Sequence, residues 1–250
     1  SLKTDFSYTD FAPGGGMMAL RAGAFPTETT TPYEVVGAPA RDGCDGSGEG
    51  LVILGEAPLE VTLTDDAINT ILLAAWQGGF LEFLAPESLF GDFDLAAFGI
   101  ADLQANVSGM LPPSVSNCGP GGSPLLTIGD IKLLVSMDFA GTPLELEIYA
   151  SVAAEFNLSA SDGGIGFGLG EISVVELELT SLQDEQIGLE PVISILLEDQ
   201  ALPGLFESLQ GDALGGFPLP EIALSEDNPE LALSIVPLDV IREGGNSVVL

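Results

Sequence analysis

Few side chains in this sequence could combine to do acid–base or nucleophilic chemistry. The 250 residues contain no histidine, which removes Ser-His and Cys-His catalysis and every histidine-liganded metal site. Acidic residues that lie close together in sequence include the pairs Asp65/Asp66, Asp92/Asp94 and Asp184/Glu185. The first pair fits a helix start, where negative charge suits the helix dipole, and the other two fit turns or strand ends.

Motifs of catalytic or cofactor-binding loops are also missing. The chain has no GxSxG elbow, no P-loop and no SxxK. The loop at 42–49 lacks the acid spacing of an EF-hand, and the alternating glycines at 164–170 favour a curved or closely packed strand over phosphate binding. The sequence predicts a protein that is not an enzyme and has no cofactor and no metal site. A glycosidase-type carboxylate pair stays open, because spacing in sequence cannot reveal one.

The charge of the chain is one-sided. Thirty-eight acidic residues face only five basic ones, for a formal net charge of −33. Nucleic-acid binding needs a basic footprint, and attraction to an anionic membrane needs the same, so neither partner is expected. The acidity fits the solubility of an apolar protein or a salty environment, and the alternative is an acidic docking face for a cationic partner.

The composition is strongly apolar for a chain with so much net charge. Hydrophobic residues make up 46%, charged residues 17%, and the mean hydropathy is +0.41. The usual charged fraction is about 25%. The run Ile71–Trp76 is far shorter than the roughly 20 residues that cross a bilayer. The apolar excess therefore predicts either an unusually large core or a cavity that holds something apolar.

The two cysteines and the N-terminal residues of the sequence indicate the cellular compartment of the protein. Cys44 and Cys118 each lie in a loop rich in Gly, Pro or Ser, which favours a Cys44–Cys118 disulfide in an oxidising compartment, with two free thiols as the alternative. Ser1–Asp5 shows no targeting pattern and no initiator Met, as expected of a processed or trimmed product. We expect an extracytoplasmic protein that is secreted, periplasmic or tethered to an outer surface.

The clearest predicted element is a helix that begins after Thr64 as N-cap. Apolar residues from Ile68 to Trp76 follow at helical spacing, and Gly78-Gly79 ends the helix. Pro191 begins a second predicted helix, whose apolar stripe reaches Gly211. The segment 80–86 between these regions is expected to be irregular. Residues 1–32 are expected to form an extended arm.

Most of the remaining sequence favours strands. Leu144, Leu146 and Ile148 alternate with polar neighbours, which predicts one wet and one dry face. Arg242–Gly245 has the composition of a hairpin turn. The predicted strands are 33–36, 51–54, 59–63, 102–107, 128–139, 143–158, 172–181, 231–240 and 247–250. The predicted fold is α+β, with long, strongly twisted antiparallel strands around one or two apolar helices in a single domain.

The stretch Leu63–Gly79 resembles the helix of the tubular lipid-binding proteins, the relatives of bactericidal/permeability-increasing protein, lipopolysaccharide-binding protein and cholesteryl ester transfer protein. Further matches are Met110-Leu111-Pro112, Pro124 and Phe217–Pro220, so that the resemblance spans roughly residues 50–225. It implies that 33–250 form a single barrel with an apolar tunnel, where family members usually have two. The family's lipopolysaccharide binders use a basic tip, and this chain has nothing comparable.

The resemblance and the apolar excess together predict non-catalytic binding and transfer of a neutral or zwitterionic lipid: acyl chains, phospholipid or sterol. The open end of a single barrel would favour a homodimer or a partner protein. The competing interpretation of any one apolar residue is plain core packing, and the alternative function is a structural or adhesive extracellular β-rich module without ligand. The expected tunnel lining is Leu72, Trp76, Phe80, Phe83, Ile193, Leu197, Phe206 and Leu209.

Overall fold

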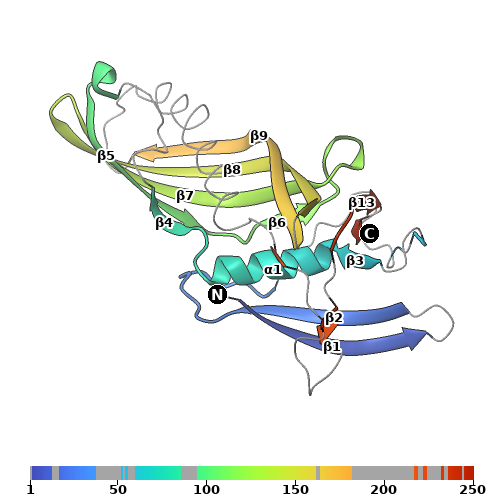
Figure 1. The fold of residues 1–250 in the computed structure, drawn as a ribbon. Coiled ribbons are helices and arrows are strands. Elements are labelled where there is room, and N and C mark those ends of the chain that lie inside the picture. The colour runs from blue at the N-terminus through green and yellow to red at the C-terminus, as the bar shows by residue number, and fades with distance from the viewer. Residues whose placement is uncertain are drawn as a thin grey trace.

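The structure is a computed structural model, and its described parts are antiparallel strands around one α-helix (Figure 1). The described residues are 2–12, 17–37, 52, 54–55, 60–85, 95–161, 164–181, 217–218, 222–223, 232–233, 236–243 and 245–250. No helix in these ranges is both long enough and apolar enough to span a membrane.

A seven-stranded antiparallel sheet dominates the molecule. Its path runs β10-β9-β8-β7-β5-β4, and β6 pairs with β7 beside it. The strands are β4 (Glu82–Ala85), β5 (Ile100–Gly109), β6 (Ser114–Ser116), β7 (Leu125–Phe139), β8 (Thr142–Ser161), β9 (Gly164–Ser181) and β10 (Phe217–Pro218). The sheet curls as a half-barrel (Figure 1). The described strands do not close it, so the expected closed barrel with a tunnel is not shown.

The predicted alternation in β8 is confirmed. Leu144, Leu146 and Ile148 are buried on the inner face, whereas Glu145 on the outer face is exposed. The same period of two continues in β5 and β7, because successive side chains of a strand point to opposite faces. Much of the apolar excess is therefore gathered on one face of one sheet.

The helix α1 spans Asp65–Gln77, between the seven-stranded sheet and an N-terminal hairpin (Figure 1). The hydroxyl of Thr64 accepts a hydrogen bond from the Ala67 amide at 3.2 Å, as predicted for an N-cap. The Gly78 amide donates to the Ala74 carbonyl at 3.0 Å, and Gly79 adopts φ 82°, so the glycine pair ends the helix as predicted.

Smaller sheets surround the helix. β1 (Leu2–Ala12) and β2 (Met17–Pro26) form the N-terminal hairpin, and β2 packs on α1. A three-stranded sheet has the order β13-β14-β3, with β3 at Val61–Thr64, β13 at Val240–Glu243 and β14 at Asn246–Val249. The remaining elements are β11 (Ile222–Ala223), β12 (Ala232–Leu233) and the 3-10 turns η2 (Leu95–Phe98) and η3 (Pro120–Gly122).

Five sequence-based predictions of local structure need correction, and the first is the expected strand 51–54, whose described residues 52 and 54 are not in a strand. The expected arm at 1–32 contains the β1–β2 hairpin, and its boundary with a barrel stays a prediction. Residues 33–36 are not a strand. The segment just before them is held at the end of α1, where the Thr30 amide donates to the Gln77 carbonyl. Residues 82–85 of the expected irregular segment are strand β4, which pairs with β5. The expected strand 231–240 is interrupted at 236–239, where Pro237 cannot donate to a ladder.

Candidate functional site

The main hydrophobic core brings together the described members of the predicted lining, two from α1 and two from the segment after it. Leu72 and Trp76 are 2% and 1% exposed and belong to the main hydrophobic core. Phe80 and Phe83 are half-buried and pack against the same core. The other four predicted residues, Ile193, Leu197, Phe206 and Leu209, lie outside the described residues, as does the whole predicted second helix.

Trp76 is fixed in place by a polar contact that the sequence did not reveal. Its indole Nε1 donates to the Gly109 carbonyl at the end of β5, at 2.6 Å. Glycine at position 109 allows this close approach, because an added Cβ would lie 2.6 Å from the side chain of Leu81. The indole therefore anchors α1 to the sheet in addition to filling the core.

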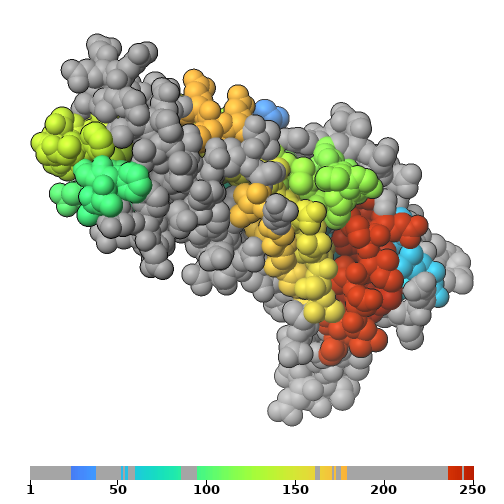
Figure 2. Space-filling view, turned by 90° about the horizontal axis from the view of Figure 1, so that it is seen from above, coloured from blue at the N-terminus to red at the C-terminus, as the bar shows by residue number. Residues whose placement is uncertain are grey.

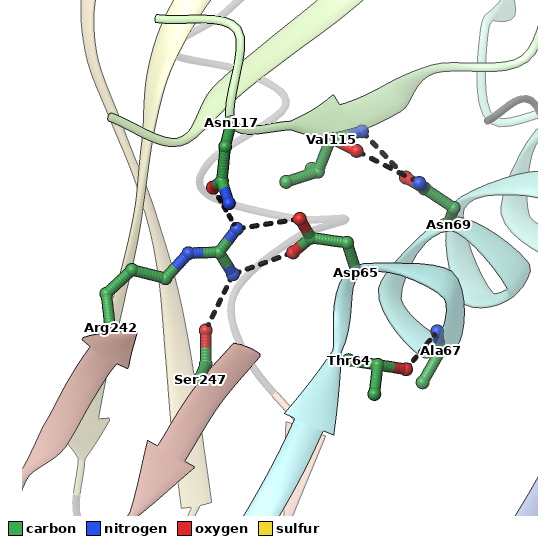
Figure 3. Close-up of polar contacts among 8 residues, drawn as sticks. All are labelled: Thr64, Asp65, Ala67, Asn69, Val115, Asn117, Arg242 and Ser247. Carbon is green, nitrogen blue, oxygen red and sulfur yellow. Dashed lines mark hydrogen bonds and ion pairs between the residues drawn. The ribbon is translucent and has the colours of Figure 1, made fainter. Parts of the chain in front are cut away.

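Asn69 makes a second anchor on the same helix. Its side chain is 3% exposed, and its Nδ2 donates to the Val115 carbonyl at 3.0 Å while its Oδ1 accepts from the Val115 amide at 2.6 Å (Figure 3). The side-chain amide thus pairs with the backbone N–H and C=O of Val115, as a neighbouring strand would at the edge of β6. A polar residue on the buried face of an amphipathic helix was the available signal in the sequence.

Arg242 ties the C-terminal hairpin to the beginning of α1. Its two terminal nitrogens lie 2.7 Å from the two carboxylate oxygens of Asp65, and they also donate to Asn117 at 2.5 Å and Ser247 at 3.1 Å (Figure 3). The sequence explained Asp65 only as a helix-start residue. Its partner is 177 positions away, so no local pattern could indicate the pair.

Beyond the helix, the dry face of the sheet continues as an apolar surface buried within the same hydrophobic core. α1 packs against β2, β3 and β6, whereas the inner faces of β5, β7 and β8 extend away from it toward η2 (Figure 1). We call this surface the apolar wall. Its members are buried and uncharged: Leu103, Val107, Leu133, Val135, Met137, Leu144, Leu146 and Ile148.

The outer face of the same sheet is polar. Lys132 Nζ lies 3.1 Å from Glu147 Oε1, the Tyr149 hydroxyl donates to the same carboxylate, and the ammonium lies 5.7 Å from the Tyr149 ring centre. The Tyr149 hydrogen bond and then Lys132 hold the pKa of Glu147 below its ordinary value. The same carboxylate raises the pKa of Lys132 and of Tyr149.

A shallow hollow of about 260 Å³ lies beside this cluster on the outer face. Its lining is mostly acidic and polar: Met110, Asp130, Tyr149, Ser151, Glu176 and Glu178. Within the described ranges, no three His, Cys, Asp or Glu side chains are placed to hold a metal ion. The carboxylates that line the hollow suit an apolar ligand poorly, and we take the apolar wall as the candidate site.

The predicted disulfide cannot be placed, because Cys44 lies outside the described residues. Cys118 follows Asn117, one of the residues that hold Arg242. The Cys44–Cys118 pairing stays a prediction.

Comparison with known proteins finds similarity among solved structures and none in sequence. No protein-family model matches the chain, and no curated protein matches it in sequence. Among solved structures, the crystal structure of lipopolysaccharide binding protein is similar to it, with a TM-score of 0.37 and 14% identity over 93% of this chain and 48% of that one. The chain thus spans about half the length of that structure. This likeness is slight, and membership of the tubular lipid-binding family stays a prediction.

Proposed function

We propose that this protein binds a neutral or zwitterionic lipid through its acyl chains or sterol body, without catalysis, and passes it between membranes. The observation that carries the proposal is the apolar wall, a continuous, uncharged and buried face on the inside of a curled sheet. Large apolar surfaces that hold ligands are the usual basis of lipid and cofactor sites. An extracytoplasmic location is part of the proposal.

The charge distribution supports a ligand without net negative charge. The chain has five basic residues, and two of them, Lys132 and Arg242, are paired with the carboxylates of Glu147 and Asp65. Lys132 also lies on the outer face of the sheet, away from the apolar wall. A polyanionic headgroup would meet repulsion from the 38 acidic residues, whereas a phosphocholine or a sterol hydroxyl would not.

The first experiment extracts lipid from protein purified out of cells and identifies it by mass spectrometry. A fluorescent fatty acid and a fluorescent sterol are then titrated into delipidated protein. Protein that is empty after purification and takes up neither probe would contradict the proposal.

Two neighbouring substitutions on β7 test the apolar wall itself. Val135 is buried on the wall, and Ser136 is exposed on the opposite face. V135D places a charge on the wall and should abolish uptake, whereas S136D adds the same charge outside and should leave uptake near wild type. If V135D does not fold, L146W keeps the wall apolar, and energy transfer from the new indole to a bound dansyl fatty acid reports contact directly.

The second candidate function is a structural or adhesive module with a dry core. It is favoured by the burial of the core, in which Ile68, Leu72 and Trp76 of α1 are 1–2% exposed and the members of the apolar wall are 1–7% exposed. Such a module would yield no lipid on extraction, and V135D would affect its stability only.

A further inference from the structure

One end of the seven-stranded sheet forms a compact projection that contains no charged residue. It consists of η2 with Gly99 and of the turn between β7 and β8 with Pro143, and we call it the tip. The Ala140 amide donates to the Gly99 carbonyl at 2.8 Å and joins the two segments. They lie side by side at an end of the molecule far from the C-terminus (Figures 1 and 2).

The backbone holds the tip in one conformation. Ala140 and Gly141 have φ of 51° and 84°, as in the two-residue turns that match the twist of a hairpin. The Asp138 carboxylate accepts from the Gly141 amide at 2.7 Å, and the Gly99 amide donates to the Ala96 carbonyl at 3.0 Å. A surface that is already ordered loses little conformational entropy when it binds.

The side chains of the tip are apolar and exposed. Phe98 is 47% exposed, and Ala96, Ala97, Ala140 and Pro143 are exposed around it. Residues 95–101 and 139–143 include no acidic or basic residue, although the chain carries a net charge of −33. The first charged residues beyond the two segments along the chain, Asp94, Asp102, Asp138 and Glu145, are all acidic.

We propose that the tip docks on the uncharged interface of a zwitterionic membrane by inserting Phe98. A basic protein partner would be drawn to the acidic faces of the molecule, a second copy would bring another −33 charges, and an anionic membrane would be repelled. A zwitterionic interface has no net charge and takes up apolar side chains. Among these partners, the membrane alone matches both the apolar character of the tip and the charge around it.

The tip also continues into the apolar wall, and here the inference rests on the proposed function. The hairpin that closes at the tip pairs Phe139 with Thr142 and, two positions further from the turn, Met137 with Leu144. Met137 and Leu144 are members of the wall. Docking at the tip would therefore bring the end of the wall to the membrane surface, where a lipid enters or leaves.

Vesicle flotation of the full chain tests the docking. Wild type should float with phosphatidylcholine vesicles, and F98D should partition about tenfold less, since half-burying a phenylalanine is worth about a factor of ten. The matched control is F25D, which changes a phenylalanine of β2 that is 53% exposed and should leave flotation within about twofold. Binding should be the same at 0.05 and 1 M salt, and phosphatidylserine in the vesicles should weaken it at low salt.

A spectroscopic variant reports insertion directly. In F98W the new indole should shift its emission to the blue with vesicles and be quenched by brominated phosphatidylcholine, over the background of the buried Trp76. Wild type that does not float, or F98D that floats as well as wild type, would overturn the inference. So would a dimer that F98D dissociates, because the tip would then contact a second copy.

The failure of docking and the failure of the proposed function give different results. Uptake of a fluorescent fatty acid from solution by the wild-type chain tests the apolar wall without a membrane. Uptake without flotation would reject the tip alone, whereas flotation without uptake would reject the lipid-binding function and leave a membrane-docking module.

Discussion

Removing the Asn69 side chain should break the hydrogen bonds that join α1 to the edge of β6. N69A deletes both partners of the buried Val115 backbone groups, which lie 3.0 and 2.6 Å from the amide. Leaving a buried donor or acceptor unsatisfied costs about 1–3 kcal/mol each. We therefore expect N69A to lose about 2–4 kcal/mol of the free energy of unfolding.

Urea denaturation followed by far-UV circular dichroism and by Trp76 fluorescence measures the loss. For a domain of this size, about 3 kcal/mol corresponds to a fall in Tm of roughly 6–12 °C. The control is T70A at the next helix position, which removes one exposed bond from the Thr70 hydroxyl to the Asp66 carbonyl and should cost under about 1 kcal/mol.

A third variant separates hydrogen bonding from packing. N69L fills a similar volume but offers neither donor nor acceptor, so it should be destabilised nearly as much as N69A, and the Val115 amide should exchange faster in both variants. N69L as stable as wild type would refute the reasoning, because the Val115 groups would then have been paired by something other than Asn69.

Four shorter predictions follow from other contacts. R242M should lower the free energy of unfolding by about 2–3 kcal/mol, since it leaves a half-buried carboxylate unpaired; R242K should recover only part of the loss in a urea titration, having no bidentate fork. The pKa of Glu147 is depressed, so its stabilisation is present above the ordinary glutamate pKa and lost as pH falls through the lower folded value; E147Q should flatten the acid side of the Tm–pH curve. Raising salt from 0.15 to 1 M shortens the Debye length from about 8 to 3 Å, so Tm should rise and sedimentation should shift toward dimer; a constant Tm with strictly monomeric protein would contradict this. Trp76 fluorescence emission should be blue-shifted, and emission typical of tryptophan in water would contradict the packing. G109A should lower Tm, because the new methyl group meets the Leu81 side chain.

Local sequence was sufficient to predict α1 and the two faces of β8. The N-cap bond spans Thr64 to Ala67 and the stop signal occupies Gly78 and Gly79, so the local signals for both helix ends lie within four residues. The dry face of β8 follows from a period of two, which needs only the alternation of residue types. The same logic placed Leu72 and Trp76 on a buried face.

Tertiary structure decided the rest of the described site, because its contacts join residues far apart in the chain. Strand β4 exists through its pairing with β5, and Arg242 meets Asp65 across 177 positions. Leu133 and Leu144 share the apolar wall because β7 and β8 turn back on each other at Ala140 and Gly141. Apolar composition determined that this protein must bury or cover a large hydrophobic surface. Strand order and curl decided that this surface is one continuous wall. The hydrophobic effect is non-directional, so only the pairing of distant strands determines which apolar side chains lie next to each other.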